Sequence, residues 1–312
     1  MPLRFFAPKY WPTWVGLGFL RVFERLPHPW LLRAGHFIGW LARRLPLNYI
    51  QVARCNLRLC LPELSERERE RLLDRHFREL GVGLCESAMT WWSSNERIDN
   101  LARIEGIEHL QQALTLGRGA ILLTAHFTTL EIGARILNGV MPISFLYRPP
   151  KNALLAYFAE RNRARRAQRA IARDDIRGMI RALKENSCVW YAPDQSYRKK
   201  GAEMVRFFGL PAATNVFTSR LARLTGAAVL LYSHERLPGS QGYRVRISPA
   251  LADFPGSCPI ADAERFNRFI ESEVRRIPEQ YWWIHRRFKG LSGDYPNYYG
   301  KAARRVRPEP AL

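Results

Sequence analysis

The chain has 312 residues, 47% of them hydrophobic, which is enough to bury a full core. Its 49 Lys and Arg residues against 28 Asp and Glu residues give a formal net charge of +21, which suits a polyanionic partner such as nucleic acid or anionic lipid head groups. Its five cysteines contain no C-x-x-C pair, which argues against a zinc site and a disulfide framework. Nine Trp residues beside many Arg and Lys residues favour a bilayer interface as the partner.

The N-terminal segment combines basic residues with an apolar stretch. Arg21, Glu24 and Arg25 cut this stretch short of the roughly 20 residues that a bilayer span needs, and no small-residue cleavage site follows. We therefore expect a retained anchor that lies in or dips into the membrane, followed by a second apolar and basic helix, WLLRAGHFIGWLARRL. The alternative is an amphipathic helix that packs on the core.

Membrane-anchoring helices are accordingly expected in residues 1–45, and a single α/β domain in residues 46–312. Ser65 and Glu68 form a capping-box pattern at the start of a long helix before residue 92. After it, apolar runs predict strands at ARIEG, GAILLTA, ISFLY, SCVWYA, AAVLLYS and YRVRIS. Helical patterns cover 107–116, 128–138, 152–170 and 174–185. This alternation predicts βα units around a mostly parallel central sheet flanked by helices, with reactive groups at the carboxyl ends of the strands.

A histidine and a glutamate follow the apolar run GAILLTA, in the segment LLTAHFTTLE. His126 and Glu131 are separated by five residues, which places them about 140° apart on a regular helix. They can meet only if His126 lies on the turn before the helix. There a carboxylate bonded to one imidazole nitrogen would leave the other free to take a proton from a hydroxyl. The competing interpretation is that Thr128 and Glu131 form a capping box and that His126 is a structural histidine.

Other candidate residues also follow predicted strands. Arg148 directly follows ISFLY, and Arg163 lies in a run of arginines that is mostly a solvated face. An arginine aimed into a cleft at the strand ends would bind phosphate or an oxyanion. Asp194, after SCVWYA, is either a turn former or a neighbour of the His126 turn. We expect the segment 195–215 to be either a flap that contacts a head group and an acyl chain or a plain surface loop. G-x-S-x-G, nucleotide-binding and H-E-x-x-H strings are absent, so we expect no metal and no cofactor.

A set of ordered strings carries a resemblance to a known family. The strings are YWPTWVGLGFL, the H-x-x-x-x-E element, YRPP-x-N, RDDIRGMIRALK, VWYAPDQSY, FFG followed by AAT, and PEQYWWIHRRFK. Together they resemble the lipid A biosynthesis late acyltransferases of Gram-negative bacteria, known as lauroyl or myristoyl acyltransferases, nearly from end to end. The segment RKKGAEMVRFFG departs from the family pattern, which leaves the substrate contacts of that loop open.

The resemblance implies an enzyme with a glycerolipid-acyltransferase-like fold. It would move a fatty acyl chain, lauroyl (C12) or a related chain, from acyl carrier protein to a hydroxyl of a 3-hydroxyacyl chain on a lipid A precursor, at the cytoplasmic face of the inner membrane. His126 would be the general base and Glu131 its orienting partner. Arg163 would contact the reacting carbonyl or a phosphate, and Arg148 and Asp194 fall on shared motifs. Acyl carrier protein would be a co-substrate.

Two alternative functions also fit the sequence. The first is a lysophospholipid or other glycolipid acyltransferase that uses related H-x4-acid chemistry. The second is a basic nucleic-acid-binding protein, because stacked aromatic side chains also serve single-stranded nucleic acid. The family resemblance disfavours this second alternative. The preferred set of partners is therefore acyl carrier protein, the glycolipid and the inner-membrane surface, without nucleic acid.

Overall fold

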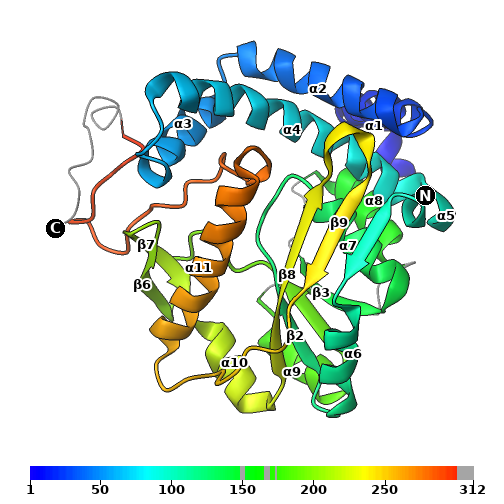
Figure 1. Cartoon of the computed structure of the whole chain (residues 1–312). Helices are drawn as coiled ribbons and strands as arrows, with labels where there is room; N and C mark the ends of the chain where they lie inside the picture. The colour runs from blue at the N-terminus through cyan, green and yellow to red at the C-terminus, as the bar shows by residue number, and fades with distance from the viewer. Residues whose placement is uncertain (148–151, 165–168, 173, 301–312) are drawn as a thin grey trace.

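The computed structural model describes residues 1–147, 152–164, 169–172 and 174–300, without the side chains of residues 159–160 and 162–164. These residues form a seven-stranded sheet flanked by helices and a separate two-stranded hairpin (Figure 1). The sheet order is β1-β9-β8-β2-β5-β3-β4, and its neighbours are parallel except β8 and β9. The predicted mostly parallel central sheet is thereby confirmed.

The strands of the large sheet are β1 (Ala102–Glu105), β2 (Ala120–Leu123), β3 (Ile143–Tyr147), β4 (Arg169–Ala172), β5 (Cys188–Tyr191), β8 (Ala228–Arg236) and β9 (Tyr243–Ile247), and the hairpin consists of β6 (Ala202–Phe207) and β7 (Leu210–Asn215). The α-helices are α1 (Trp11–Glu24), α2 (His28–Arg44), α3 (Asn48–Cys60), α4 (Glu66–Trp92), α5 (Asn95–Asp99), α6 (Ile107–Thr115), α7 (Leu130–Val140), α8 (Ala153–Ala164), α9 (Ile176–Lys184), α10 (Phe217–Thr225) and α11 (Pro259–Arg276).

Two parts of the sequence prediction are wrong. Residues 169–170 were expected to end a helix, but they begin β4, a short edge strand that pairs with β3. Much of the segment 195–215 was expected to be a flap or a surface loop, but it is the antiparallel β6–β7 hairpin. Both elements depend on partners distant in sequence, because β4 needs the edge of β3 and the hairpin packs on α11.

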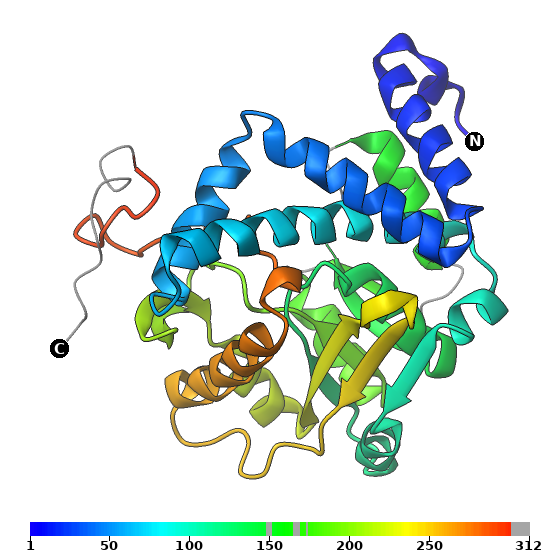
Figure 2. The ribbon, with the colours of Figure 1, turned by 45° about the horizontal axis from the view of Figure 1, so that its top comes forward.

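Helix α4 is the long helix predicted before residue 92, and it begins with the expected capping box of Ser65 and Glu68. It crosses α2 at very short range, and the two helices lie side by side above the sheet (Figure 2). A Cβ atom on Gly39 would lie 2.0 Å from the carbonyl oxygen of Phe77, and one on Gly81 would lie 2.1 Å from that of Gly35. The crossing therefore requires glycine on both helices.

A buried ion-pair network fixes α4 to the sheet. Arg236, the last residue of β8, donates from Nε and Nη2 to the two carboxylate oxygens of Glu86 and from Nη1 to Glu79. Both Arg236 and Glu86 are buried, and a two-pronged guanidinium–carboxylate contact also fixes orientation. The contact sets the distance of α4 from the sheet edge at which the predicted site residues lie.

The N-terminal helices combine packing with exposed apolar surface. Helix α1 buries Leu17 against Phe5 and against Leu154 of α8, and in Figure 2 it projects from the body of the molecule. In the described part of the chain, no helix has both the length and the apolar character needed to cross a membrane. The large apolar side chains that this region exposes include Leu3, Phe6, Trp11, Val15, Phe19, Val22, Trp30, Phe37 and Leu41.

Candidate active site

The sheet register brings His126 and Asp194 together. Strands β2 and β5 are parallel neighbours, with Leu123 directly opposite Tyr191. His126 lies three residues beyond Leu123, and Asp194 lies three residues beyond Tyr191, so both residues leave the sheet at the same edge. The predicted position of His126, on the turn between a strand and a helix, is confirmed, and so is the expected proximity of Asp194.

One carboxylate holds both the backbone and the ring of His126. Asp194 Oδ2 accepts a hydrogen bond from the His126 backbone N–H at 2.9 Å, and Oδ1 lies 2.5 Å from the ring atom Nδ1. The Asp194 side chain is 2% exposed, whereas that of His126 is 25% exposed. A buried carboxylate therefore orients a ring that still reaches the surface of the site, and Nε2 is the ring nitrogen left available for chemistry.

The electrostatics of this pair favour the charged forms of both groups. Burial alone would lower the pKa of His126, but the charge and hydrogen bond of Asp194, together with the charge of Glu131, raise it above its ordinary value. Burial alone would raise the pKa of Asp194, but the charge and hydrogen bonds of His126 and the charge of Arg287 hold it below its usual range. Asp194 therefore remains ionised at neutral pH.

The structure corrects the predicted partner of the ring. The carboxylate hydrogen-bonded to His126 is Asp194 and not Glu131, whose exposed side chain acts on the ring through its charge. The capping-box interpretation of Thr128 and Glu131 is also wrong. Helix α7 begins at Leu130, its N-cap is Thr129, and the Thr129 side chain makes no capping hydrogen bond to it. The carboxylate that positions His126 comes from the next strand of the sheet.

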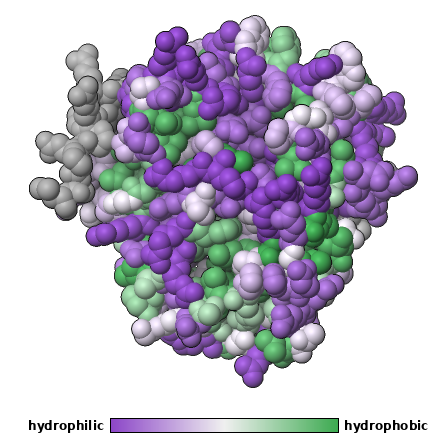
Figure 3. Space-filling model, viewed as in Figure 1, coloured by the Kyte–Doolittle hydropathy of each residue, from purple (hydrophilic) through white to green (hydrophobic). Residues whose placement is uncertain are grey.

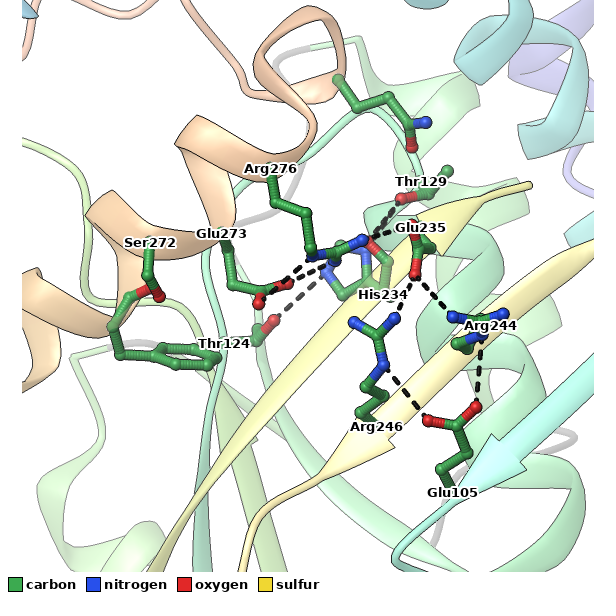
Figure 4. A network of polar contacts seen from close by, with 12 residues as sticks. Glu105, Thr124, Thr129, His234, Glu235, Arg244, Arg246, Ser272, Glu273 and Arg276 are labelled. Carbon is green, nitrogen blue, oxygen red and sulfur yellow. Dashed lines mark hydrogen bonds and ion pairs between the residues drawn. The ribbon is translucent and has the colours of Figure 1, made fainter. Parts of the chain in front are cut away.

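Another histidine joins the two ends of the turn that carries His126. His234, buried on β8, hydrogen-bonds through Nε2 to Thr124 Oγ1 at 3.1 Å and through Nδ1 to Thr129 Oγ1 at 2.9 Å (Figure 4). Burial lowers the pKa of His234 to about 3, so this ring is neutral. Its role is to fix the turn, because the two threonines lie on either side of His126.

A network of charges around the buried side chain of Glu235 lies close to His234. The carboxylate of Glu235 pairs with Arg244, Arg246 and Arg276, and Figure 4 shows the three guanidinium groups converging on it. Hydrophilic side chains dominate the surface over the upper part of α11 and over β8 and β9 (Figure 3). The network joins α11 to β8 and β9 on this face.

The segment Pro278–Trp283 fixes the His126 turn from the other side. The backbone N–H of Trp282 donates to the His126 carbonyl at 2.9 Å, and the backbone N–H of Thr128 donates to the Gln280 carbonyl at 2.7 Å. The Gln280 side chain in turn forms two hydrogen bonds with the backbone of Arg236, each at 2.9 Å. Its Oε1 accepts from the Arg236 N–H, and its Nε2 donates to the Arg236 carbonyl. The turn is therefore held at its backbone as well as through the His126 ring.

A cavity of about 510 Å³ adjoins the pair. It lies between α4, α7 and the strand β3, and His126 and Glu131 contribute to its wall. This volume falls within the range of about 300–1,000 Å³ that is usual for ligand sites. Most of its lining is apolar: Leu80, Leu84, Trp91, Phe127, Leu130, Ala134, Ile143, Phe145, Leu146, Trp190 and Trp282. The cavity suits a long apolar group whose reacting end lies at His126.

The remaining predicted residues have different outcomes. Arg148 lies outside the described residues. Arg163 belongs to α8, but its side chain also lies outside the described part. Sequence reasoning assigned no role to Tyr281, His285 and Arg287, which line a small cavity together with Asp194. All three lie in PEQYWWIHRRFK, one of the strings on which the family resemblance rests. This string was the sequence signal from which their place in the site could have been predicted.

The fold and the site define an α/β protein with a carboxylate-supported histidine at the mouth of an apolar cavity. Comparison with known proteins gives the family: the profile described as bacterial lipid A biosynthesis acyltransferase matches residues 3–290. The chain belongs to this family and is an acyltransferase of lipid A biosynthesis.

Similar proteins include the lipid A biosynthesis palmitoleoyltransferase of Escherichia coli K12, which is 40% identical over 92% of this chain and 94% of its own. The lipid A biosynthesis lauroyltransferase of the same strain is 36% identical over 94% of this chain and 96% of its own. The lipid A biosynthesis myristoyltransferase of that strain is 26% identical, over 89% of this chain and 86% of its own. Relatives named for three different acyl chains thus match nearly the whole chain.

The charges around His126 predict how its titration responds to substitution. The ring should titrate above the ordinary histidine value near 6.5. Asp194→Asn should lower the pKa of the ring because it removes both a charge and a charge-assisted hydrogen bond. Glu131→Gln should lower it less because it removes a charge alone. NMR titration of ¹³C-labelled histidines, with His126→Gln to assign the signal, measures these values. A larger shift in Glu131→Gln than in Asp194→Asn would contradict the assignment of the ring partner.

Proposed function

We propose that this protein transfers a fatty acyl chain, lauroyl or a related chain, from acyl carrier protein to the hydroxyl of a 3-hydroxyacyl chain on a lipid A precursor. The observation that carries the proposal is the His126–Asp194 pair at the wall of an apolar cavity, in a chain of the lipid A acyltransferase family. The family supplies the class of acceptor, and the pair supplies a base suited to a hydroxyl nucleophile.

In the proposed mechanism, His126 acts as the general base. With Nδ1–H donating to Asp194, Nε2 takes the proton from the acceptor hydroxyl as its oxygen attacks the thioester carbonyl. The resulting tetrahedral oxyanion collapses, the carbon–sulfur bond breaks, and the thiol of the carrier leaves with the proton from Nε2. Asp194 stabilises the imidazolium that forms between these two steps because it stays ionised beside it.

The cavity supports the proposal of an acyl substrate. Its lining follows α7 from Leu130 to Asn138, eight residues further along the chain, which corresponds to about 12 Å of helix. Ala134 lies midway along this wall, and Ser87 contributes a small side chain from α4. A chain bound along this path would place its carboxyl end at His126 and its methyl end toward Asn138 and Ile143.

Charge and exposed apolar surface support the proposed partners and location. Acyl carrier protein is acidic, and the precursor is a phosphorylated glycolipid, so a chain of net charge +21 attracts both. The exposed apolar residues of α1 and α2, with Arg33 and Arg44 stacked on Trp30 and Trp40, fit a membrane interface. We place the protein at the cytoplasmic face of the inner membrane, and we propose that Glu131 adjusts the basicity of His126 while Arg148 and Arg163 contact phosphate or the oxyanion.

The proposed base is tested by His126→Ala. Purified protein in detergent is supplied with lauroyl carrier protein and tetraacylated lipid A precursor, and the product is quantified by mass spectrometry. We expect a loss of roughly a hundredfold or more, because removing a general base forfeits about that factor. The matched control is His109→Ala, a substitution on α6, which does not line the cavity and should keep normal activity. Full activity in His126→Ala would refute the mechanism.

The same assay distinguishes the acceptor and the donor. Transfer to a lysophospholipid in place of the lipid A precursor would favour the alternative acyltransferase. Transfer from acyl-coenzyme A alone, with none from acyl carrier protein, would refute the proposed donor. Lipid A from a strain that lacks the gene should lose one secondary acyl chain if the proposal is right and be unchanged if it is wrong.

Ala134 tests the proposed path of the acyl chain. Ala134→Phe fills the middle of the cavity and should shift the preference toward shorter acyl chains. We expect the ratio of kcat/KM between a chain that still fits and one that is one or two methylenes too long to change by about 10-fold or more. Competition among carrier proteins loaded with acyl chains of different length measures the preference. Val140→Phe, at the exposed end of the same helix, is the control and should leave the preference unchanged. An unchanged preference in a folded Ala134→Phe protein would exclude this path.

A further inference from the structure

Arg287 is a buried cation that lies shortly after the segment Pro278–Trp283, which fixes the His126 turn. The residue is 3% exposed, and its guanidinium donates from Nη1 to the Ala213 carbonyl and from Nη2 to Thr214 Oγ1, at 2.8 Å each. Both acceptors are neutral, and Nε has no hydrogen-bond partner among the residues that the structure describes. Because an isolated buried charge is costly, this cation needs a nearby charge of opposite sign.

Asp194 is the charge that meets this need. Arg287 and Asp194 line the same small cavity of about 10 Å³, and His126 lines it as well. The two groups stabilise each other's charged forms: Arg287 helps to lower the pKa of Asp194, and Asp194 counteracts the lowering of the Arg287 pKa by burial. The shared cavity has room for little water, and charges that are buried in this way are screened weakly.

The same guanidinium also fixes the loop that carries Asp194. The Ala213 carbonyl that accepts from Arg287 also accepts from the backbone N–H of Tyr197, three residues beyond Asp194. Between these positions, the backbone N–H of Ser196 donates to Nε2 of His285 at 3.1 Å. Arg287 and His285 therefore connect one C-terminal segment to both the hairpin and the Asp194 loop.

We propose that Arg287 is a positioning residue that keeps Asp194 ionised and correctly placed, so that Asp194 can orient and charge-balance the His126 ring. It acts through Asp194, because its depth in the fold keeps it from touching substrate. The inference uses the proposed function only in assuming that His126 must be neutral to accept a proton.

The test compares Arg287→Gln, which removes the charge, with Arg287→Lys, which keeps it. Without the cation the His126–Asp194 pair binds its proton more tightly. In Arg287→Gln, the pKa of the His126 ring and the acid limb of the kcat/KM profile should therefore both move to higher pH, by about one unit. Arg287→Lys should remain near the wild type in both readouts, and KM for the acyl carrier substrate should not change. The matched control, Arg286→Gln, alters an exposed neighbour and should move neither readout.

The outcomes separate this inference from the proposed function. If the ring titration moves but the rate profile does not, His126 is not the base, whereas the role of Arg287 stands. If neither moves in a folded Arg287→Gln protein, or if Lys and Gln are equally impaired, the inference is overturned. If Arg287→Gln does not fold, the double variant Asp194→Asn/Arg287→Gln should recover folded protein, because no unbalanced buried charge remains. Failure of the double variant to fold would also overturn it.

Discussion

The buried carboxylate of Asp194 is the interaction on which the site depends. Because only 2% of its side chain is exposed, this carboxylate needs hydrogen-bond donors and an opposite charge inside the protein. Its partners are the backbone N–H and the ring of His126 and, at 3.5 Å, the hydroxyl of Tyr281, so satisfying the carboxylate also positions the imidazole. The surrounding structure keeps this arrangement in place. His234 joins the ends of the turn, Gln280 and Trp282 hold its backbone, and Arg287 supplies the opposing charge. The histidine proposed as the base lies on a loop, yet it thus gains the rigidity of an element in the core.

The same elements that fix the pair also form the cavity. Helix α4 is held over the sheet by Arg236 and its two glutamates and by the glycine-lined crossing with α2. Gly83 of α4 approaches the His126 turn so closely that a Cβ atom there would lie 2.5 Å from the carbonyl oxygen of Thr128. The wall that would hold an acyl chain and the turn that would activate the acceptor are therefore set by one packing arrangement. The fold thereby couples the position of the cavity wall to the position of His126.

Much of this site could be predicted from the sequence, because parallel strands end at a common edge. The apolar runs located β2 and β5, which placed His126 and Asp194 near each other, and the five-residue spacing to Glu131 required His126 to precede the helix. Sequence could not identify the ring partner. Glu131 is close in sequence, whereas Asp194 lies opposite only through the register of two strands. The hairpin of β6 and β7 and the roles of His285 and Arg287 were missed because they arise from long-range packing.

We propose that Asp194 makes His126 an effective base, and single-turnover acyl transfer by Asp194→Asn measures this effect. With acyl carrier protein and lipid A precursor bound at saturation, we expect the transfer step to be slower by roughly a hundredfold or more. The affinity for both substrates should be little changed, since the cavity wall does not include Asp194. Transfer at the wild-type rate by a folded Asp194→Asn protein would show that Asp194 does not support the base.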